Sequence, residues 1–142
     1  MIVSTRGRYA LRVLVDLAEQ CSGVFIPMKD VAQRQEISLK YIERIMPVLT
    51  KNGLVEGQHG KGGGYRLVKS PEEYRVGDIL RLTEGDLAPV ACLECGAKAC
   101  TRAAECRTLP MWTEFYKLAT DYFNSITLAD LMKGGGADNY SI

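Results

Sequence analysis

The sequence lacks several features that would place it in common classes of protein. It has a single histidine, His59, and no paired-carboxylate motif, so no enzymatic site is indicated and we do not expect an enzyme. No apolar run approaches the roughly 18 residues that a membrane span needs. The first residues also lack the apolar segment of a secretory signal. We therefore expect a cytoplasmic protein with no membrane partner, in which thiols stay reduced.

The net charge of +1 conceals an asymmetry between the two halves of the chain. Residues 1–70 hold 11 Lys/Arg and 6 Asp/Glu, a balance of +5, whereas residues 71–142 hold 7 and 11, a balance of −4. This division indicates a basic, anion-facing N-terminal part joined to an acidic remainder. Chance clustering of solvated charges would give the same numbers, so charge alone does not assign a function.

Three helices are predicted in the N-terminal half. Apolar residues recur with helical spacing over residues 9–21, 28–35 and 38–52, and Ser38 has the side chain of an N-cap for the third helix. Cys21 lies on the apolar stripe of the first helix, where we expect a small buried hydrophobe. The tight connection between the second and third helices is typical of a helix-turn-helix.

In a helix-turn-helix, outward residues at the start of the second helix reach base edges in the major groove. The candidate DNA contacts on this face are Ser38, Lys40, Tyr41, Glu43 and Arg44. A plain three-helix core with a solvated face would show the same pattern, because such patterns also arise by chance.

Residues 54–68 are predicted to form two short strands around a glycine-rich tip. A β-hairpin directly after a recognition helix is the wing of a winged helix. The tip carries His59 and Lys61, which are candidates for contact with a DNA phosphate or the minor groove. We therefore predict a mainly α fold with a small β-hairpin wing, and a DNA-binding domain at residues 1–70.

Residues 71–133 are predicted to contain a short helix at 76–82, a cysteine loop and a long amphipathic helix. The apolar stripe of the long helix comprises Trp112, Phe115, Tyr116, Ala119, Tyr122, Phe123 and Ile126. A monomer of this size has little to cover such a stripe, so we predict a dimerisation helix rather than an intramolecular core. Residues 134–142 are predicted to form a flexible tail.

Four of the five cysteines fall between Cys92 and Cys106. Two residues separate Cys92 from Cys95, four separate Cys95 from Cys100, and five separate Cys100 from Cys106. Where thiols stay reduced, this pattern indicates metal ligands or redox groups before structural disulfides. Thiolates suit an iron–sulfur cluster or zinc, and four would complete an all-thiolate site. The spacing is not that of ferredoxins, which argues against an electron carrier.

Several motifs together carry a family resemblance. They are Gly7-Arg8-Tyr9-Ala10, Ile37-Ser38 with Tyr41-Ile42-Glu43, Leu49-Thr-Lys-Asn-Gly-Leu-Val55, Gly60-Lys-Gly-Gly-Gly-Tyr65, the cysteine loop, and Asn124-Ser-Ile-Thr-Leu128. With them, roughly residues 1–132 resemble the iron–sulfur cluster regulator (IscR-like) family of dimeric winged-helix transcription factors. The resemblance implies a homodimer that reads a palindromic operator in double-stranded DNA, under the control of an iron–sulfur cluster.

The resemblance also implies ligands for that cluster. Cys92, Cys100 and Cys106 match the family's ligands, and a [2Fe–2S] cluster is favoured over [4Fe–4S]. Cys95 is the natural fourth ligand. Alternatively it is a spare thiol, and the fourth ligand is a carboxylate such as Glu43, Glu94 or Glu105, or comes from the partner chain. Such a regulator would sense iron–sulfur status or oxidative or nitrosative stress. The alternative function is a winged-helix repressor with zinc or a thiol/disulfide switch in the loop.

The sequence departs from the family pattern at four places. Seven residues, with Cys95 among them, lie between the first two matching cysteines, where the family has five. Leu109 stands where the best-known members have a ligand histidine, and Arg8 stands where another branch has an acidic ligand. Glu36 occupies a turn where glycine is common, and a positive φ there would strain a residue with a Cβ.

Overall fold

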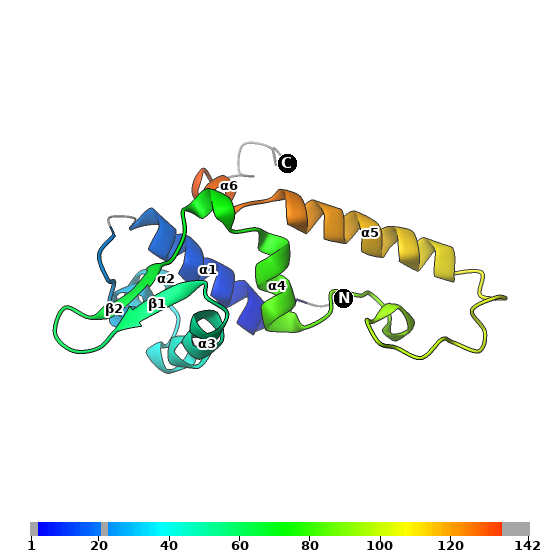
Figure 1. The fold of residues 1–142 in the computed structure, drawn as a ribbon, viewed down its shortest axis with the longest axis horizontal. Helices are drawn as coiled ribbons and strands as arrows, with labels where there is room; N and C mark the ends of the chain where they lie inside the picture. The colour runs from blue at the N-terminus through cyan, green and yellow to red at the C-terminus, as the bar shows by residue number, and fades with distance from the viewer. Residues whose placement is uncertain (1–2, 21–22, 135–142) are drawn as a thin grey trace.

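The computed structural model describes residues 3–20 and 23–134 of the 142-residue chain. It is mainly helical, with one two-stranded antiparallel sheet (Figure 1). In chain order the elements are α1 (Thr5–Glu19), α2 (Met28–Gln35), α3 (Leu39–Lys51), β1 (Val55–Gln58), β2 (Gly64–Leu67), the 3-10 turn η1 (Pro71–Glu73), α4 (Val76–Glu84), the 3-10 turn η2 (Ala91–Leu93), α5 (Leu109–Ser125) and α6 (Leu128–Met132). The predicted fold class, mainly α with a β-hairpin, is confirmed.

Helix α1 begins four residues before the start that apolar spacing predicts. The Ser4 hydroxyl caps it by accepting the Gly7 N–H at 3.4 Å. The polar first turn contains no apolar residue that periodicity could detect. The helix ends at Glu19, so the predicted burial of Cys21 lies outside the described residues.

The turn between α2 and α3 holds a strained residue. Helix α2 spans the predicted residues 28–35, and the Ser38 hydroxyl caps α3 by accepting the Tyr41 N–H at 3.1 Å. Between them Glu36 adopts φ 55° and ψ 42°, the only positive φ of a non-glycine residue in the described ranges. This left-handed conformation places the Cβ close to backbone oxygen, so the strain predicted from the sequence is confirmed.

Helix α1 lies at the centre of the N-terminal core. The largest fully buried side chains of this core are Leu14, Ile42, Ile45, Met46, Leu49, Ile79, Leu128, Val13, Val31 and Val55. Each such side chain contributes roughly 1.5–3 kcal/mol by leaving water, so this core fixes the positions of the surrounding elements. A partly buried ion pair adds to it, because the exposed Arg34 of α2 donates to both carboxylate oxygens of the buried Asp16 at 2.7 and 3.1 Å.

The hairpin is fixed at its base and along its inner edge. Strands β1 and β2 pair antiparallel, with Val55 opposite Leu67, and Ile26 pairs with Tyr65 on the other edge of β2. The buried Tyr74 hydroxyl donates to a backbone carbonyl at 2.6 Å and accepts two backbone N–H groups at 3.0 and 3.1 Å. The wing therefore has a definite orientation relative to α3.

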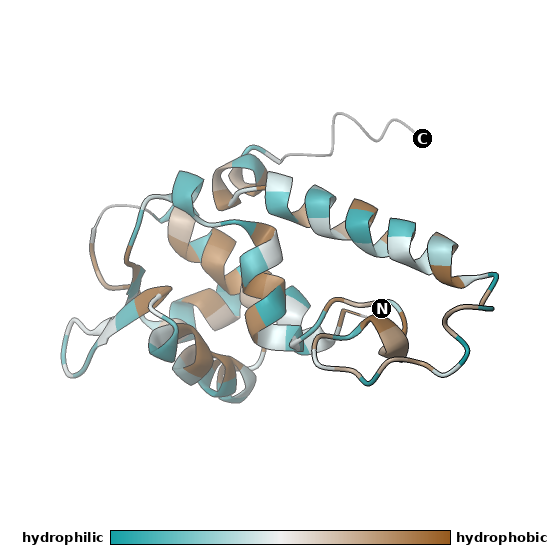
Figure 2. Cartoon of the chain, turned by 45° about the vertical axis from the view of Figure 1, so that its right-hand side comes forward, coloured by the Kyte–Doolittle hydropathy of each residue, from teal (hydrophilic) through white to brown (hydrophobic). Residues whose placement is uncertain are grey.

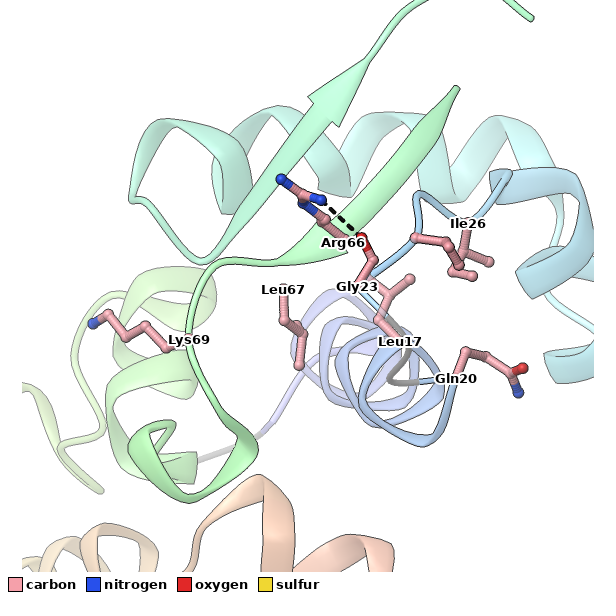
Figure 3. Close-up of a pocket in the computed structure, with 8 residues that line it drawn as sticks. Leu17, Gln20, Gly23, Ile26, Arg66, Leu67 and Lys69 are labelled. Carbon is pink, nitrogen blue, oxygen red and sulfur yellow. Dashed lines mark hydrogen bonds between the residues drawn. The ribbon is translucent and has the colours of Figure 1, made fainter. Parts of the chain in front are cut away.

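Arg66 also fixes the wing. It reaches from β2 to the segment after α1 and donates to the Gly23 carbonyl at 2.7 Å (Figure 3). Its guanidinium carbon lies 4.3 Å from the centroid of the Phe25 ring. The small cavity beneath, about 80 Å³, is lined partly by Leu17 and Leu67. Arg66 thus stabilises the hairpin and is not part of its exposed tip.

The C-terminal segments return to α1. Leu128 of α6 and Ile79 of α4 belong to the same core as the first three helices, and a β-bridge joins Arg75 to Thr127. The core therefore includes residues on both sides of residue 70, and the division into domains at 1–70 and 71–133 stays a prediction. The predicted tail at 134–142 lies outside the described residues, apart from Gly134.

Helix α5 is the longest element and extends away from the N-terminal core, and the cysteine loop runs outward from α4 to the far end of α5 (Figure 1). None of its residues is buried in the single chain. Across the described ranges, α5 included, no helix has both the length and the apolar character of a membrane span.

Candidate DNA-binding face and cysteine loop

The predicted DNA contacts on α3 lie on its outer side. The helix buries Ile42, Ile45, Met46 and Leu49, so Lys40, Glu43 and Arg44 are exposed together with the capping Ser38. Tyr41 is half-buried, because its ring packs edge-on against Tyr9 of α1 with the ring centroids 5.3 Å apart. Its ring therefore also holds α3 on α1.

The two predicted wing residues lie at the exposed tip of the hairpin. His59 and Lys61 fall between β1 and β2, and both are exposed. Gly64 follows the tip with φ 148°, and a Cβ there would lie 2.2 Å from the carbonyl oxygen of Ile26. A larger residue would push β2 away from Ile26, so the glycine keeps the wing in place.

The four loop cysteines lie between α4 and α5. Cys92, Cys95 and Cys100 are exposed, Cys106 is half-buried, and all four are free thiols. Among the residues that the structure describes, no three His, Cys, Asp or Glu side chains are gathered closely enough to hold a metal ion. The donor set suits an iron–sulfur cluster or zinc by its chemistry. The loop would have to close before the thiols could share one site.

The suggested carboxylate alternatives differ in position. Glu94 and Glu105 lie within the loop itself, whereas Glu43 lies on α3, in the N-terminal part of the fold (Figure 1). Leu109 and Arg8, which stand where family members have ligands, supply no metal-ligating atom. Within this chain the loop cysteines are therefore the strongest set of soft donors.

Cys106 has an environment that favours its thiolate. Its sulfur lies 3.5 Å from the Thr108 hydroxyl. Hydrogen bonds from this hydroxyl and from the Thr108 backbone N–H lower the pKa of Cys106, and the positive charge of Arg102 adds to the effect. A thiolate is the form that binds metals and reacts with oxidants. The environment therefore suits either a ligand or a redox-active thiol.

Asp86 anchors the first part of the cysteine loop. Its carboxylate accepts the backbone N–H of Cys95 at 2.6 Å, the N–H of Ala88 at 2.8 Å and the Tyr116 hydroxyl at 2.8 Å. The bond from Cys95, followed by that from Tyr116, lowers the pKa of Asp86, and the bond to Asp86 raises the pKa of Tyr116. Asp86 thus joins the backbone of one loop cysteine to α5.

Sequence reasoning missed this role, because Asp86 looks only like part of a helix stop. A local signal existed for the bond to Ala88, since Asp side chains commonly accept a backbone N–H two residues on. The bonds to Cys95 and Tyr116 have no local signal, because they depend on how the loop and α5 fold back.

Glu84, two residues earlier, holds the start of α1. Its carboxylate accepts the Ser4 hydroxyl at 2.6 Å, the Ser4 N–H at 3.1 Å and the Gly7 N–H at 3.1 Å. A Cβ at Gly7 would lie 2.3 Å from the same carboxylate oxygen, so a larger residue there would displace the Glu84 carboxylate. We name Glu84 and its contacts with Ser4 and Gly7 the Glu84 clasp. The clasp and Asp86 together link the start of α1 to the cysteine loop.

Helix α5 carries two apolar faces, which corrects the single stripe predicted from the sequence. Tyr116, Phe123 and Ile126 pack against a small core of Val76, Leu80 and Leu87. The other face holds Met111, Phe115, Leu118 and Tyr122, which are 54%, 46%, 58% and 54% exposed. Figure 2 shows apolar and polar residues alternating along this helix.

Apolar spacing in the sequence could not separate the two faces. Adjacent residues such as Phe115 and Tyr116 lie only about 100° apart around the helix axis, so two neighbouring apolar faces look like one broad stripe. The prediction therefore missed Met111 and Leu118, which complete the exposed face. Their spacing with Phe115 and Tyr122 follows the i, i+4, i+7, i+11 pattern of a helix–helix seam.

The fold is shared with solved regulator structures. The structure of CymR, the global cysteine regulator of B. subtilis, has a TM-score of 0.77 and 31% sequence identity, covering 94% of this chain and 97% of that one. T. potens IscR has a TM-score of 0.73 and 31% identity, covering 100% of this chain and 93% of that one. Both likenesses extend over α5 and the loop as well as the winged helix.

The sequence is also similar to known proteins over nearly its full length. Protein rrf2 of Nitratidesulfovibrio vulgaris (strain Hildenborough) is 41% identical over 133 residues, covering 94% of this chain and 88% of that protein. The HTH-type transcriptional regulator IscR of Pectobacterium carotovorum (strain PC1) is 35% identical over 132 residues, covering 93% and 79%.

The family described as "Rrf2: Iron-dependent Transcriptional regulator" matches residues 3–134. This match takes in the winged helix, the cysteine loop and α5, so it supports the resemblance predicted from the sequence motifs. DNA binding and transcriptional regulation, rather than enzymatic activity, follow from it. The chain belongs to the Rrf2 family of transcriptional regulators.

Proposed function

We propose that this regulator binds a palindromic operator as a homodimer, and that an iron–sulfur cluster on the cysteine loop controls the binding. One observation carries the proposal. Four free thiols lie on a loop that Asp86, two residues after the end of α4, ties to α5, because its carboxylate accepts both the Cys95 N–H and the Tyr116 hydroxyl. A ligand that closes this loop would therefore act directly on α4 and α5.

DNA reading is assigned to the exposed side of α3 and to the wing tip. Ser38, Lys40, Tyr41, Glu43 and Arg44 would contact base edges and phosphates in the major groove, and His59 and Lys61 would contact the adjacent backbone or minor groove. The exposure of the α3 residues and of the wing tip supports this assignment. Two copies of α3 would have to lie about 34 Å apart to read consecutive major grooves.

Dimerisation is assigned to the exposed face of α5. Four large apolar side chains at helical spacing favour a second copy of the same helix as their cover. Such a pairing would place the two winged helices on either side of the α5 pair. It would also make their separation sensitive to the angle between α4 and α5.

A [2Fe–2S] cluster would be held by Cys92, Cys100 and Cys106, with Cys95 as the fourth ligand. When bound, it would supply an iron- and oxidant-sensitive group whose presence reports cellular conditions. The residues of this chain do the rest. Asp86 holds the backbone of Cys95 next to α5, and the Glu84 clasp holds α4 on the start of α1. Cluster state can alter DNA affinity only by favouring one of two such arrangements.

Anaerobic purification tests the cofactor. The expected result is a brown protein in which iron, sulfide and the thiolate-to-iron absorption bands are present together. Each of Cys92→Ala, Cys100→Ala and Cys106→Ala is expected to abolish the bands, whereas Cys21→Ala, the matched cysteine outside the loop, leaves them intact. A colourless protein with stoichiometric zinc would reject the cluster.

A thiol/disulfide switch is the second candidate. Two observations favour it. No three loop cysteines are gathered in the described conformation, and one of the similar structures is the oxidized form of Staphylococcus aureus CymR. If this candidate is right, the protein is colourless. Mass spectrometry after mild oxidation would then find a reversible disulfide that includes Cys106, the thiol whose environment lowers its pKa.

A further inference from the structure

We propose that Arg6 of α1 and Arg44 of α3 together hold one backbone phosphate of DNA. The site is a cavity between the two helices, beside the recognition face. This inference rests on the DNA-binding function and adds to it a phosphate subsite that lies partly outside the helix-turn-helix. Arg6 has no role in the assignments made above.

The cavity has the composition of an anion site. Its volume is about 470 Å³, and its lining residues are Arg6, Tyr41, Arg44, Ile45 and Val48. Two guanidinium groups and one phenol face it, and none of the lining residues is acidic. Arginine offers a planar fork of N–H donors that matches the oxygens of a phosphate.

Both guanidinium groups are free to take a ligand. In the described part of the chain, the side chains of Arg6 and Arg44 have no hydrogen bond and no ion pair. Neighbouring arginines of α1 differ in this respect. Arg8 donates to the Thr5 hydroxyl, and Arg12 donates to the side-chain and backbone oxygens of Gln35. Among the arginines of residues 3–20 and 23–70, the two whose side chains have no such partner are therefore the two that line the cavity.

The framework that positions them is rigid. The rings of Tyr9 and Tyr41 meet edge-on across the contact between α1 and α3, 5.3 Å apart. Arg6 lies three residues before Tyr9 and Arg44 three residues after Tyr41, which is one turn along each helix. The aromatic pair therefore fixes the separation of the two arginine-bearing turns, and only the two arginine side chains have to become ordered when a phosphate binds.

The location favours a DNA phosphate over a free anion. Arg44 is on the exposed side of α3, next to Glu43 and one turn from Lys40, so DNA in contact with these residues would pass its backbone over the cavity. The Glu84 clasp also holds the turn of α1 that carries Arg6. A change in the clasp would therefore move one half of the phosphate site.

Salt-dependent binding to a fluorescein-labelled duplex of random sequence tests the proposal, with the full-length protein and the variants Arg6→Ala, Arg44→Ala and the double variant. Each single variant is expected to bind roughly tenfold more weakly per bound protomer. Each is also expected to reduce the slope of log affinity against log salt by about 0.9 per protomer, the value for one lost phosphate contact. If the two side chains share one phosphate, the double variant has the same slope as either single variant. Lys117→Ala, which removes one positive charge from α5, is the control and leaves the slope unchanged.

A scan of single methylphosphonate substitutions along the duplex used as operator locates the phosphate. At one position per half-site, the neutral methylphosphonate should weaken DNA binding by the wild-type protein but not by Arg6→Ala or Arg44→Ala. If the cavity held only free phosphate ions, no position would have this effect. Wild-type affinity in either single variant, or slope losses that add in the double variant, would overturn the shared site while leaving DNA binding in place. Failure of the wild-type protein to bind any duplex would overturn the proposed function and this site together.

Discussion

The Glu84 clasp is one of the contacts by which α4, the helix before the cysteine loop, holds α1 of the winged helix, so its removal should affect both stability and regulation. Glu84→Ala deletes one carboxylate that accepts three hydrogen bonds from the start of α1. The donors do not become fully orphaned, because the Ser4 groups are exposed and the Gly7 N–H retains the Ser4 hydroxyl at 3.4 Å.

The magnitude follows from that geometry. Hydrogen bonds to a charged acceptor contribute about 1.5–3 kcal/mol when they are shielded from water, and much less when the donor is exposed. Only the Gly7 donor is buried, so we expect a total loss of about 1.5 kcal/mol in the free energy of unfolding. For a chain of 142 residues the unfolding entropy is roughly 0.3 kcal/mol/K, so Tm should fall by about 5 °C.

Thermal unfolding followed by circular dichroism at one fixed protein concentration measures this change. Glu19→Ala is the control, because Glu19 is an exposed glutamate on α1 outside the clasp. We expect that control to shift Tm by less than 2 °C, within the range of surface substitutions. The double variant Ser4→Ala, Glu84→Ala should lose less Tm than the sum of the losses in the two single variants, because both substitutions remove the hydrogen bond between the Ser4 hydroxyl and Glu84. A Tm for Glu84→Ala equal to the wild-type value would refute the clasp.

Three further predictions concern separate parts of the molecule. Glu36→Gly should raise the free energy of unfolding by about 0.5–1 kcal/mol in urea titrations, because glycine relieves the left-handed strain; a lower stability would contradict this. The N–H and hydroxyl of Thr127 lower the folded-state pKa of Asp130, so its stabilising effect is present above an unfolded pKa of about 3.9 and is lost as pH falls through the folded value. Asp130→Asn should therefore lower Tm at pH 7 and leave Tm nearly unchanged at a pH below the folded-state pKa of Asp130. An equal Tm difference between wild type and variant at both pH values would show that the charge of Asp130 does not stabilise the fold. Leu118→Glu should raise the dimer dissociation constant at least about 100-fold in sedimentation experiments, whereas Thr113→Glu, on the same helix, should not; an intact dimer in Leu118→Glu would exclude this face.

Much of the fold could be predicted from the sequence because its signals are local. Apolar spacing located the helices, Ser38 marked the start of α3, and the glycine-rich run marked the wing tip. The strained turn at Glu36 was predicted by comparison with a family in which glycine is common there. The start of α1 was missed, because its first turn is polar and is stabilised by Glu84, nearly eighty residues away.

The candidate site was predicted in its residue types but not in its connections. The cysteines and the outer residues of α3 are visible as patterns, because each pattern lies in one short segment. The bond between Asp86 and Tyr116 joins distant segments, and local patterns show Tyr116 only as part of an apolar stripe. Arg6 lines a cavity between two helices that are separate in sequence, and no local pattern distinguishes it from an ordinary surface residue. The two faces of α5 likewise became separable only once the side chains that pack against α4 were known.

The central claim is that the state of the cysteine loop controls DNA binding. Its most direct test is the affinity of one protein preparation for one palindromic promoter fragment, measured anaerobically before and after removal of the cluster. We expect the two affinities to differ by roughly 5- to 150-fold, the range of typical coupling between two sites. The variant with Cys92, Cys95, Cys100 and Cys106 all replaced by alanine should match the cluster-free protein under both conditions. Equal affinity before and after removal, with cluster content verified by iron and sulfide analysis, would contradict the account.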